Sequence, residues 1–289
     1  NKAAIIPGAK LVKHHADCEY PFRQDSDFWY LTGFDEPDSV ALFLAHKPEG
    51  ERFILFVNEK EALSEVWHGF RWGTNGAEEV FKADKAHPIN QLAEKLPNYI
   101  EGADEIIFSI GKNQEIEPII LSLWSKQLEN YSRLGIAPTA IKPVGIYLNE
   151  MRLIKSEHEI MRMREAAQIS AEAHEYLRLN MYSKNNERQL QGIIEGFFLD
   201  KGARGPAYNT IIASGDNACI LHYTENNSEL KKGDLLLVDA GCSLLDYYNG
   251  DITRTLPIGG KFSGEQRDIY EIVLAAQKNA IENVVVGNS

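Results

Sequence analysis

Short apolar runs alternate with amphipathic segments through the first half of the chain. Residues 39–45, 52–58 and 105–110 are rich in Val, Ile and Phe and predict strands. Residues 87–100 and 114–128 carry apolar side chains at helical spacing and predict helices. This half is therefore expected to form a small α/β domain.

The second half begins and ends with helix signals. Ser156 with Glu159, and Ser263 with Gln266, have the spacing of capping boxes, which begin helices. Between them, a further helix is expected to end at Gly202, followed by a strand-rich block over residues 208–258. The positions that mark the three helices, in chain order, are Ile160, Met163, Ala167, Ser170 and Leu177; Leu190, Ile193, Ile194, Phe197 and Phe198; and Ile269, Ile272, Val273 and Ala276.

Pro138, Pro143 and Gly145 interrupt the chain between the two halves. Residues of this kind often end one folded unit before the next begins. We therefore predict an N-terminal domain over residues 1–146, a second domain over residues 150–289, and an α+β chain overall.

Composition and charge narrow the functional classes. Of the 289 residues, 44% are hydrophobic and 25% are charged, which is typical of a folded protein. The net charge of −12 gives no basic surface for nucleic acid or an acidic membrane, so neither is an expected partner. The longest apolar runs are far shorter than the roughly 20 residues of a membrane-spanning helix. Three cysteines without a Cys-x-x-Cys pair favour a reducing compartment, and we expect a cytoplasmic location.

Two aspartates are candidate metal ligands. Asp239 follows the apolar residues 235–238, where a buried carboxylate needs a hydrogen bond, a base or a cation. Residues 249–255 are the expected returning strand, so Asp251 can face Asp239 across a hairpin. A divalent cation would keep both carboxylates ionised, and all-oxygen ligation favours Mn, Mg or Ca. Spacing alone leaves open that Asp239 caps a turn and that Asp251 is solvated.

Other chemistry-bearing residues have two interpretations each. His222 follows an apolar pair and can donate a hydrogen bond to a carbonyl or bind metal, or it can fill a core or edge position. Cys242 can be a soft ligand or a small buried hydrophobe. Trp67 and Trp72 can form the wall of a binding pocket or pack within the domain. The sequence has no Gly-x-Ser-x-Gly motif and no phosphate-binding glycine loop.

Six motifs follow one another over nearly the whole chain. In the second half they are residues 208–215 (YNTIIASG), 220–223 (ILHY), 239–242 (DAGC) and 250–255 (GDITRT). In the first half they are residues 19–34 (EYPFRQDSDFWYLTGF) and 151–156 (MRLIKS). Together they resemble aminopeptidase P, the Xaa-Pro aminopeptidase of the pita-bread metallopeptidases of family M24. The resemblance implies an N-terminal creatinase-like α/β domain followed by an incomplete pita-bread catalytic domain.

The resemblance also implies a role for each candidate residue. Asp239 would chelate one metal ion and Asp251 would bridge two, usually Mn²⁺, with a hydroxide between them. His222, the catalytic candidate, would hydrogen-bond the substrate or the tetrahedral oxyanion. Tyr208 would lie close to the metals, and Trp67 would reach toward a neighbouring subunit's pocket, so a homo-oligomer is expected. The substrate would be a peptide with proline in its second position.

The sequence departs from this family in two respects. The family's later ligands, a His and two Glu, and its base Glu do not occur before Ser289, so we expect a fragment without peptidase activity that binds metal weakly. Asp239 and Asp251 are twelve positions apart, one more than is usual, and we expect Leu244 and Leu245 to absorb the extra residue.

Three other functions stay open. They are an Xaa-Pro dipeptidase of the same fold, a creatinase-like hydrolase without metal, and a non-catalytic peptide-binding protein. The presence of both Asp239 and Asp251 argues against the second of these.

Overall fold

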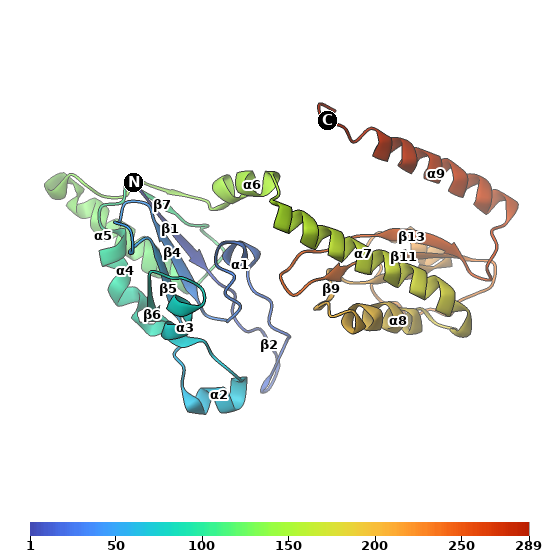
Figure 1. The fold of residues 1–289 in the computed structure, drawn as a ribbon, viewed down its shortest axis with the longest axis horizontal. Helices are drawn as coiled ribbons and strands as arrows, with labels where there is room; N and C mark the ends of the chain where they lie inside the picture. Colours follow the sequence, from blue (N-terminus) through green and yellow to red (C-terminus); the bar gives the residue numbers. More distant parts are fainter. Residues whose placement is uncertain (289) are drawn as a thin grey trace. The chain divides into compact units, whose positions relative to one another are not determined.

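The computed structural model describes residues 1–288 and divides into two compact units, Asn1–Ile154 and Lys155–Ser289 (Figure 1). The division follows Ile154 instead of lying near residue 146 as predicted. The reason is α6 (Gly145–Leu153), whose Leu148 is buried with Val144 in a core cluster of the first unit.

A six-stranded mixed sheet in the order β6-β5-β4-β1-β7-β8 is the framework of the first unit. β1 is parallel to β7 and antiparallel to β4, β4 is antiparallel to β5, and the outer pairs are parallel. The strands are β1 (Lys2–Pro7), β4 (Val40–Leu44), β5 (Phe53–Val57), β6 (Lys85–Pro88), β7 (Glu105–Ile107) and β8 (Ala140–Lys142), and a separate hairpin joins β2 (Lys13–His15) to β3 (Cys18–Glu19). The three predicted strands are thus confirmed as β4, β5 and a shorter β7.

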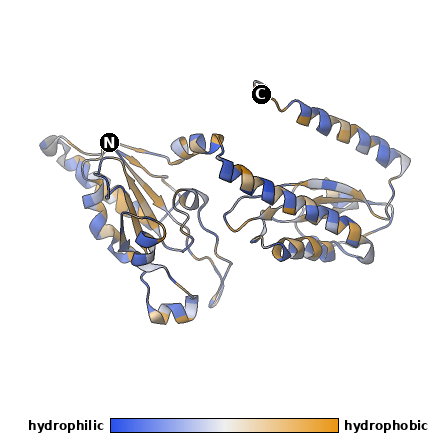
Figure 2. Ribbon diagram, viewed as in Figure 1, coloured by the Kyte–Doolittle hydropathy of each residue, from blue (hydrophilic) through white to orange (hydrophobic). Residues whose placement is uncertain are grey.

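Alternating side chains give this sheet two apolar faces. In β4, Val40 and Leu42 belong to one core cluster and Ala41 to the other, because successive strand residues point to opposite sides. The first cluster includes residues of α4 (Leu92–Ile100) and α5 (Ile116–Leu134), and the second those of α1 (Ser26–Thr32), α3 (Gly73–Glu79) and α6. Figure 2 shows the hydrophobic strands of this sheet.

One predicted helix begins later than expected. His87 and Pro88 belong to strand β6, where His87 pairs with Phe56, and a 3₁₀ turn, Ile89–Gln91, precedes α4. Pairing with β5 thus overrides the helical spacing of the apolar residues at this end.

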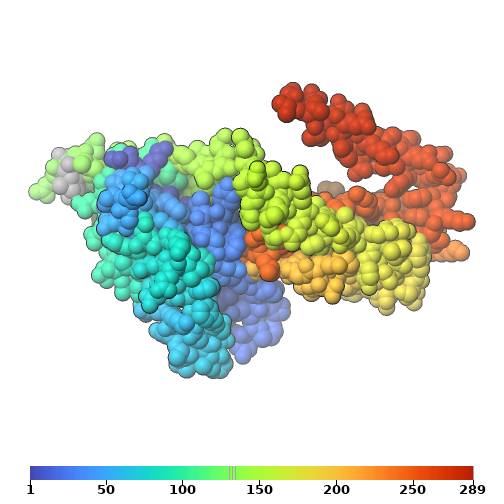
Figure 3. Space-filling view, in the orientation of Figure 1, coloured from blue at the N-terminus to red at the C-terminus, as the bar shows by residue number. Residues whose placement is uncertain are grey.

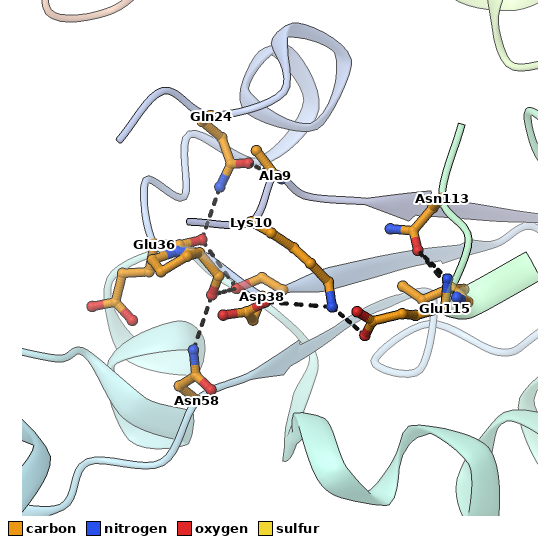
Figure 4. Close-up of polar contacts among 11 residues, drawn as sticks. Ala9, Lys10, Gln24, Glu36, Asp38, Asn58, Asn113 and Glu115 are labelled. Carbon is orange, nitrogen blue, oxygen red and sulfur yellow. Dashed lines mark hydrogen bonds and ion pairs between the residues drawn. The ribbon is translucent and has the colours of Figure 1, made fainter. Parts of the chain in front are cut away.

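Polar contacts fix the chain where it leaves β1 (Figure 4). The Oε1 atom of the buried Gln24 side chain accepts a hydrogen bond from the Ala9 N–H at 2.6 Å, and its Nε2 donates to two backbone carbonyls. Lys10 lies between Asp38, at 3.8 Å, and Glu115, with which it forms an ion pair. These contacts join the end of β1 to the loops before β4 and α5.

A three-stranded antiparallel sheet, β10-β11-β13, packs with two helices in the second unit. Its core includes Ile212, Leu236 and Val238 from the sheet and apolar residues of α7 and α8. The elements are α7 (Glu157–Asn180), a 3₁₀ turn (Met181–Ser183), α8 (Glu187–Asp200), β9 (Gly205–Pro206), β10 (Ile211–Ser214), a 3₁₀ turn (Gly215–Cys219), β11 (Leu235–Asp239), β12 (Cys242–Ser243), β13 (Thr253–Pro257) and α9 (Gly264–Glu282).

Both predicted capping boxes are confirmed. Ser156 and Glu159 cap α7 reciprocally, and Ser263 and Gln266 cap α9 in the same way.

The residues predicted to form the buried faces of these two helices are only partly buried. The buried residues of α7 begin at Ala166, whereas Ile160 and Met163 are exposed. α9 has no buried residue, and its Ile269, Ile272 and Val273 are each more than half exposed.

Among the described residues, none of the helices combines the length and apolar character needed to cross a bilayer.

Candidate metal centre

Asp239 and Asp251 lie on the two arms of a hairpin. Asp239 is the last residue of β11 and pairs with Thr253, the first residue of β13. Asp251 lies two residues before this partner, so the two aspartates are on facing arms, as expected, but are not directly opposite in the ladder. The arms continue to pair past this point, since the Ala240 N–H donates to the Ile252 carbonyl at 3.1 Å.

One tyrosine hydroxyl lies within hydrogen-bond distance of both carboxylates. The Tyr208 Oη atom is 2.7 Å from Asp239 Oδ1 and 3.1 Å from Asp251 Oδ1. These two carboxylate oxygens are therefore at most 5.8 Å apart, the sum of the two distances. The carboxylates converge on a common point despite the offset register.

The tip of the hairpin is a tight five-residue turn. Ser243 bridges to Asn249, and the Leu244 N–H donates to the Tyr248 carbonyl at 2.9 Å. Tyr247 has a φ of 66°, a left-handed conformation that closes the turn. Leu244 and Leu245, the residues expected to absorb the extra position, lie within this tip.

Gly241 lets the two arms of the hairpin approach each other, and Gly250 lets the hairpin approach α7. A Cβ atom at Gly241 would lie 1.8 Å from the carbonyl oxygen of Gly250, and a Cβ atom at Gly250 would lie 2.1 Å from Ser170 Oγ. Neither contact is possible for a real side chain, so both positions require glycine.

A buried histidine supports the same segment from α7. His174 is 7% exposed, and its Nε2 donates to the Ala240 carbonyl at 2.9 Å. Burial lowers the pKa of His174, so the neutral imidazole carries its proton on Nε2 for this contact. His174 was not predicted from the sequence, although Ser170 and Leu177 stand one helical turn away on the same buried face.

The convergent carboxylates open into a cavity of about 510 Å³. Its lining residues are Tyr208, Asn209, Ile211, His222, Thr224, Asp239 and Asp251. The structure thus brings together four of the five predicted site residues. Asn209 and Thr224 were not predicted, although both lie close in the sequence to a selected residue.

Trp67, the fifth predicted residue, belongs to the first unit. It lies on α2 (Ala62–His68), a short helix at the surface of that unit (light blue in Figure 3), and its side chain is 78% exposed. Trp72 instead packs edge-on against Phe81, with ring centroids 5.4 Å apart. Of the two interpretations of this tryptophan, packing within the domain is therefore the correct one.

Electrostatics favour a protonated Tyr208. Burial, together with the hydrogen bond to Asp239 and the negative charges of Asp239 and Asp251, raises the pKa of Tyr208 well above its usual range. The hydroxyl has one proton and can donate it to only one carboxylate at a time. Two negative charges therefore share one neutral donor.

The donor set fits an oxygen-preferring divalent cation only in part. Asp239 and Asp251 supply carboxylate oxygens, which suit Mg²⁺, Mn²⁺ or Ca²⁺. Within residues 1–288, no group of three or more His, Cys, Asp or Glu side chains is placed to hold a metal ion. Cys242 is fully buried, with its sulfur 3.5 Å from Ser170 Oγ, so it has the role of a small core residue.

Two family models match the chain, one in each unit. Residues 161–289 match "Metallopeptidase family M24", and residues 1–108 match "Aminopeptidase P, N-terminal domain". The M24 match includes Tyr208, His222 and both aspartates.

Curated and solved relatives agree with these matches. The Xaa-Pro aminopeptidase of Haemophilus influenzae is 43% identical over 289 residues, which are 100% of this chain and 64% of that protein. The structure of Pseudomonas aeruginosa aminopeptidase PepP has a TM-score of 0.92 at 38% identity. The match covers 100% of this chain and 65% of the PepP chain. A zinc-substituted Escherichia coli aminopeptidase P in complex with product has a TM-score of 0.88 at 39% identity. This match covers 97% of this chain and 64% of the Escherichia coli chain. The chain therefore spans less than two thirds of the length of these relatives.

Proposed function

We propose that the chain is part of an Xaa-Pro aminopeptidase of metallopeptidase family M24, because its two units match the M24 model and the aminopeptidase P N-terminal model. The reaction is hydrolysis of the first peptide bond of a peptide whose second residue is proline. Support comes from the relatives at 38–43% identity and from the convergence of Asp239 and Asp251 on one hydroxyl at an open cavity.

The proposed cofactor is a pair of divalent cations, with Mn²⁺ preferred because the donors are carboxylate oxygens. The Escherichia coli relative has a zinc-substituted form, which supports a divalent metal for this group of proteins. When bound, such ions supply Lewis-acid polarisation of the scissile carbonyl and a hydroxide nucleophile at neutral pH. In this chain Asp239 would hold one ion and Asp251 would bridge both.

His222 is the proposed catalytic residue of this half of the site. It is exposed and lines the same cavity as the two aspartates, so its ring is accessible to a peptide bound there. An imidazole N–H can donate a hydrogen bond to the substrate carbonyl oxygen and stabilise the negative charge that develops on that oxygen. Tyr208 would hold the carboxylates in place while remaining neutral.

Trp67 is proposed to contribute to substrate binding from a neighbouring subunit of a homo-oligomer. Its large exposed surface is unusual for a tryptophan in a folded domain and is typical of residues that bind a partner or a ligand. A cytoplasmic location is proposed on the low cysteine content alone.

We further propose that the 289-residue chain by itself is inactive and binds metal weakly. The two carboxylates of the described site are fewer than the ligands that a dinuclear centre requires.

The function is tested in a protein that carries this chain at the full length of its relatives. The assay measures Mn²⁺-dependent release of the N-terminal residue from a tripeptide with proline second, beside a matched tripeptide with alanine second and an Xaa-Pro dipeptide. We expect release from the proline tripeptide only, and loss of release in Asp251→Asn. Cleavage of the dipeptide alone would instead indicate a dipeptidase, and tight binding without cleavage would indicate a peptide-binding protein.

A further inference from the structure

A fully buried carboxylate opens α8. Glu187 is 0% exposed and directly follows the cap residue Asn186. Its Oε1 atom accepts hydrogen bonds from the Ser214 N–H at 2.8 Å and the Ser214 hydroxyl at 2.7 Å, and from Asn217 Nδ2 at 3.2 Å. Its Oε2 atom accepts from the Tyr223 hydroxyl at 2.7 Å and the Ser228 N–H at 2.9 Å. One carboxylate therefore collects five donors from residues 214–228.

These donors keep the carboxylate ionised. Burial raises the pKa of Glu187, but the hydrogen bonds from Ser214, Ser228 and Tyr223 together outweigh burial, and the pKa lies below its ordinary value. An ionised carboxylate is the stronger acceptor, so the five contacts reinforce one another.

The segment that Glu187 holds has few apolar anchors of its own. Between Gly215 and Glu229 only Tyr223 and Asn226 are buried. Leu221, beside His222, is 86% exposed, so the side chain before the histidine makes no core contact. Apart from the packing of Tyr223 with Ile211 and Ala213, this segment is therefore placed by the polar contacts of its buried residues.

Asn226 provides the second polar attachment. Its Oδ1 accepts from the Ile212 N–H at 2.9 Å and its Nδ2 donates to the Thr210 carbonyl at 2.8 Å, so the side-chain amide pairs with the edge of β10 as a neighbouring strand would. Asn226 has a φ of 46°, a left-handed conformation that asparagine tolerates better than most residues. Glu187 and Asn226 thus bracket the short stretch that carries His222.

We infer that Glu187 is a positioning residue for His222, which immediately precedes its partner Tyr223. By holding both ends and the middle of residues 214–228, the Glu187 carboxylate sets the place of the His222 ring at the cavity of Asp239 and Asp251. The inference rests on the proposed function only in assigning His222 a role in the reaction. The geometric part concerns this chain alone and is testable on it.

The test compares NMR signals of the wild-type chain, Glu187→Gln and Tyr223→Phe. Asp200→Asn is the matched control, because it exchanges an exposed carboxylate of the same helix for an amide. In Glu187→Gln the amide donors of Ser214 and Ser228 lose a charged acceptor, and we expect their hydrogen exchange to accelerate about tenfold. The His222 ring signals should shift in Glu187→Gln and, less strongly, in Tyr223→Phe, and stay in place in Asp200→Asn.

Dissolved Mn²⁺ then reports where the His222 ring lies. Even weak, fast-exchanging Mn²⁺ at Asp239 and Asp251 broadens signals of nearby rings, so both Tyr208 and His222 should broaden in the wild-type chain. In Glu187→Gln we expect the broadening of His222 to weaken while that of Tyr208 is unchanged. If Glu187 only stabilised the fold, Glu187→Gln would lower the melting temperature but leave the broadening of His222 relative to that of Tyr208 unchanged.

The outcomes separate the two ideas. If Mn²⁺ broadens neither ring, the metal proposal fails, and exchange rates and ring shifts still decide the role of Glu187. Unchanged exchange and unchanged His222 signals in a folded Glu187→Gln chain would overturn the inference. If Glu187→Gln does not fold, Tyr223→Phe decides, because it leaves four of the five donors, and an unmoved His222 signal there would equally overturn it.

Discussion

At the scale of single residues, the Tyr208 hydroxyl is the only neutral group seen to separate the charges of Asp239 and Asp251 among the described contacts. Tyr208→Phe removes this donor, and we expect the free energy of unfolding of the metal-free chain to fall by about 1 kcal/mol. The loss stays modest because Asp251 is exposed and water can replace the hydroxyl. Urea denaturation measures the change, with Tyr182→Phe, an exposed tyrosine, as the control. Equal stabilities of the two variants would contradict this account.

Glu36 is expected to make the stability of the first unit depend on pH. Glu36 is 5% exposed; its Oε1 accepts from the Trp72 N–H at 2.8 Å, while its Oε2 has no hydrogen-bond partner within residues 1–288. Burial raises the pKa of Glu36 above 4.5, against the opposing effects of Trp72 and Arg71. The folded state therefore binds the proton more tightly than the unfolded state, and this contribution to stability is lost as pH rises through the raised pKa.

Glu36→Gln keeps the shape of the side chain and removes the titration. We expect the variant to gain stability relative to the wild type as the pH rises from about 4 to about 7, measured by urea unfolding at a series of pH values. Glu59→Gln, at an exposed position of the same unit, should show no such trend. A constant difference between Glu36→Gln and the wild type over this range would show that Glu36 does not titrate there.

At the scale of elements, local signals in the sequence were the most reliable guide. The capping residues of α7 and α9 act through neighbouring backbone groups, so spacing alone identified both helix starts. The exact pairing of Asp239 with Thr253 depends on a five-residue turn at the hairpin tip, which composition does not specify. Glu187 and His174 were missed because an acid in the first helical turn usually faces water and a lone histidine usually has no special role.

α9 shows how an apolar pattern can lack a partner. Its Ile269 and Val273 are 63% and 61% exposed, and they line a cavity of about 810 Å³ with residues of β11 and β13. We predict that this surface binds a hydrophobic dye such as ANS, and that Ile269→Lys with Val273→Lys lowers the dye fluorescence without loss of helical circular dichroism. Ile281→Lys is the control, since Ile281 is 64% exposed but does not line the cavity. An equal loss of fluorescence in the control would place the dye elsewhere.

At the scale of the whole molecule, the two units differ in how completely their sheets are covered. The first unit has large apolar clusters on both faces of its sheet. The second unit has a large cluster with α7 and α8 on one face of its sheet, a small cluster of Ile211, Ala213 and Tyr223 on the other, and no residue of α9 in either. The sequence predicted two units and the α+β class because alternation and helical spacing are properties of short segments. It placed the boundary too early because the packing of α6 on the first unit is a contact between distant residues.

The number of ligands in the whole chain limits how much a bound metal ion can stabilise it. Asp239 and Asp251 are two carboxylates held near one another, and no larger set of ligands surrounds them within residues 1–288. If the dissociation constant for Mn²⁺ is about 1 mM, adding about 1 mM Mn²⁺ stabilises the folded chain by only about 0.4 kcal/mol. We therefore expect a small rise in melting temperature with Mn²⁺, its disappearance in Asp251→Asn, and no release of an N-terminal residue from an Xaa-Pro peptide by this chain. Stabilisation by several kcal/mol would mean that further groups complete the site, and measurable peptidase activity would show that the two aspartates and His222 suffice for the reaction.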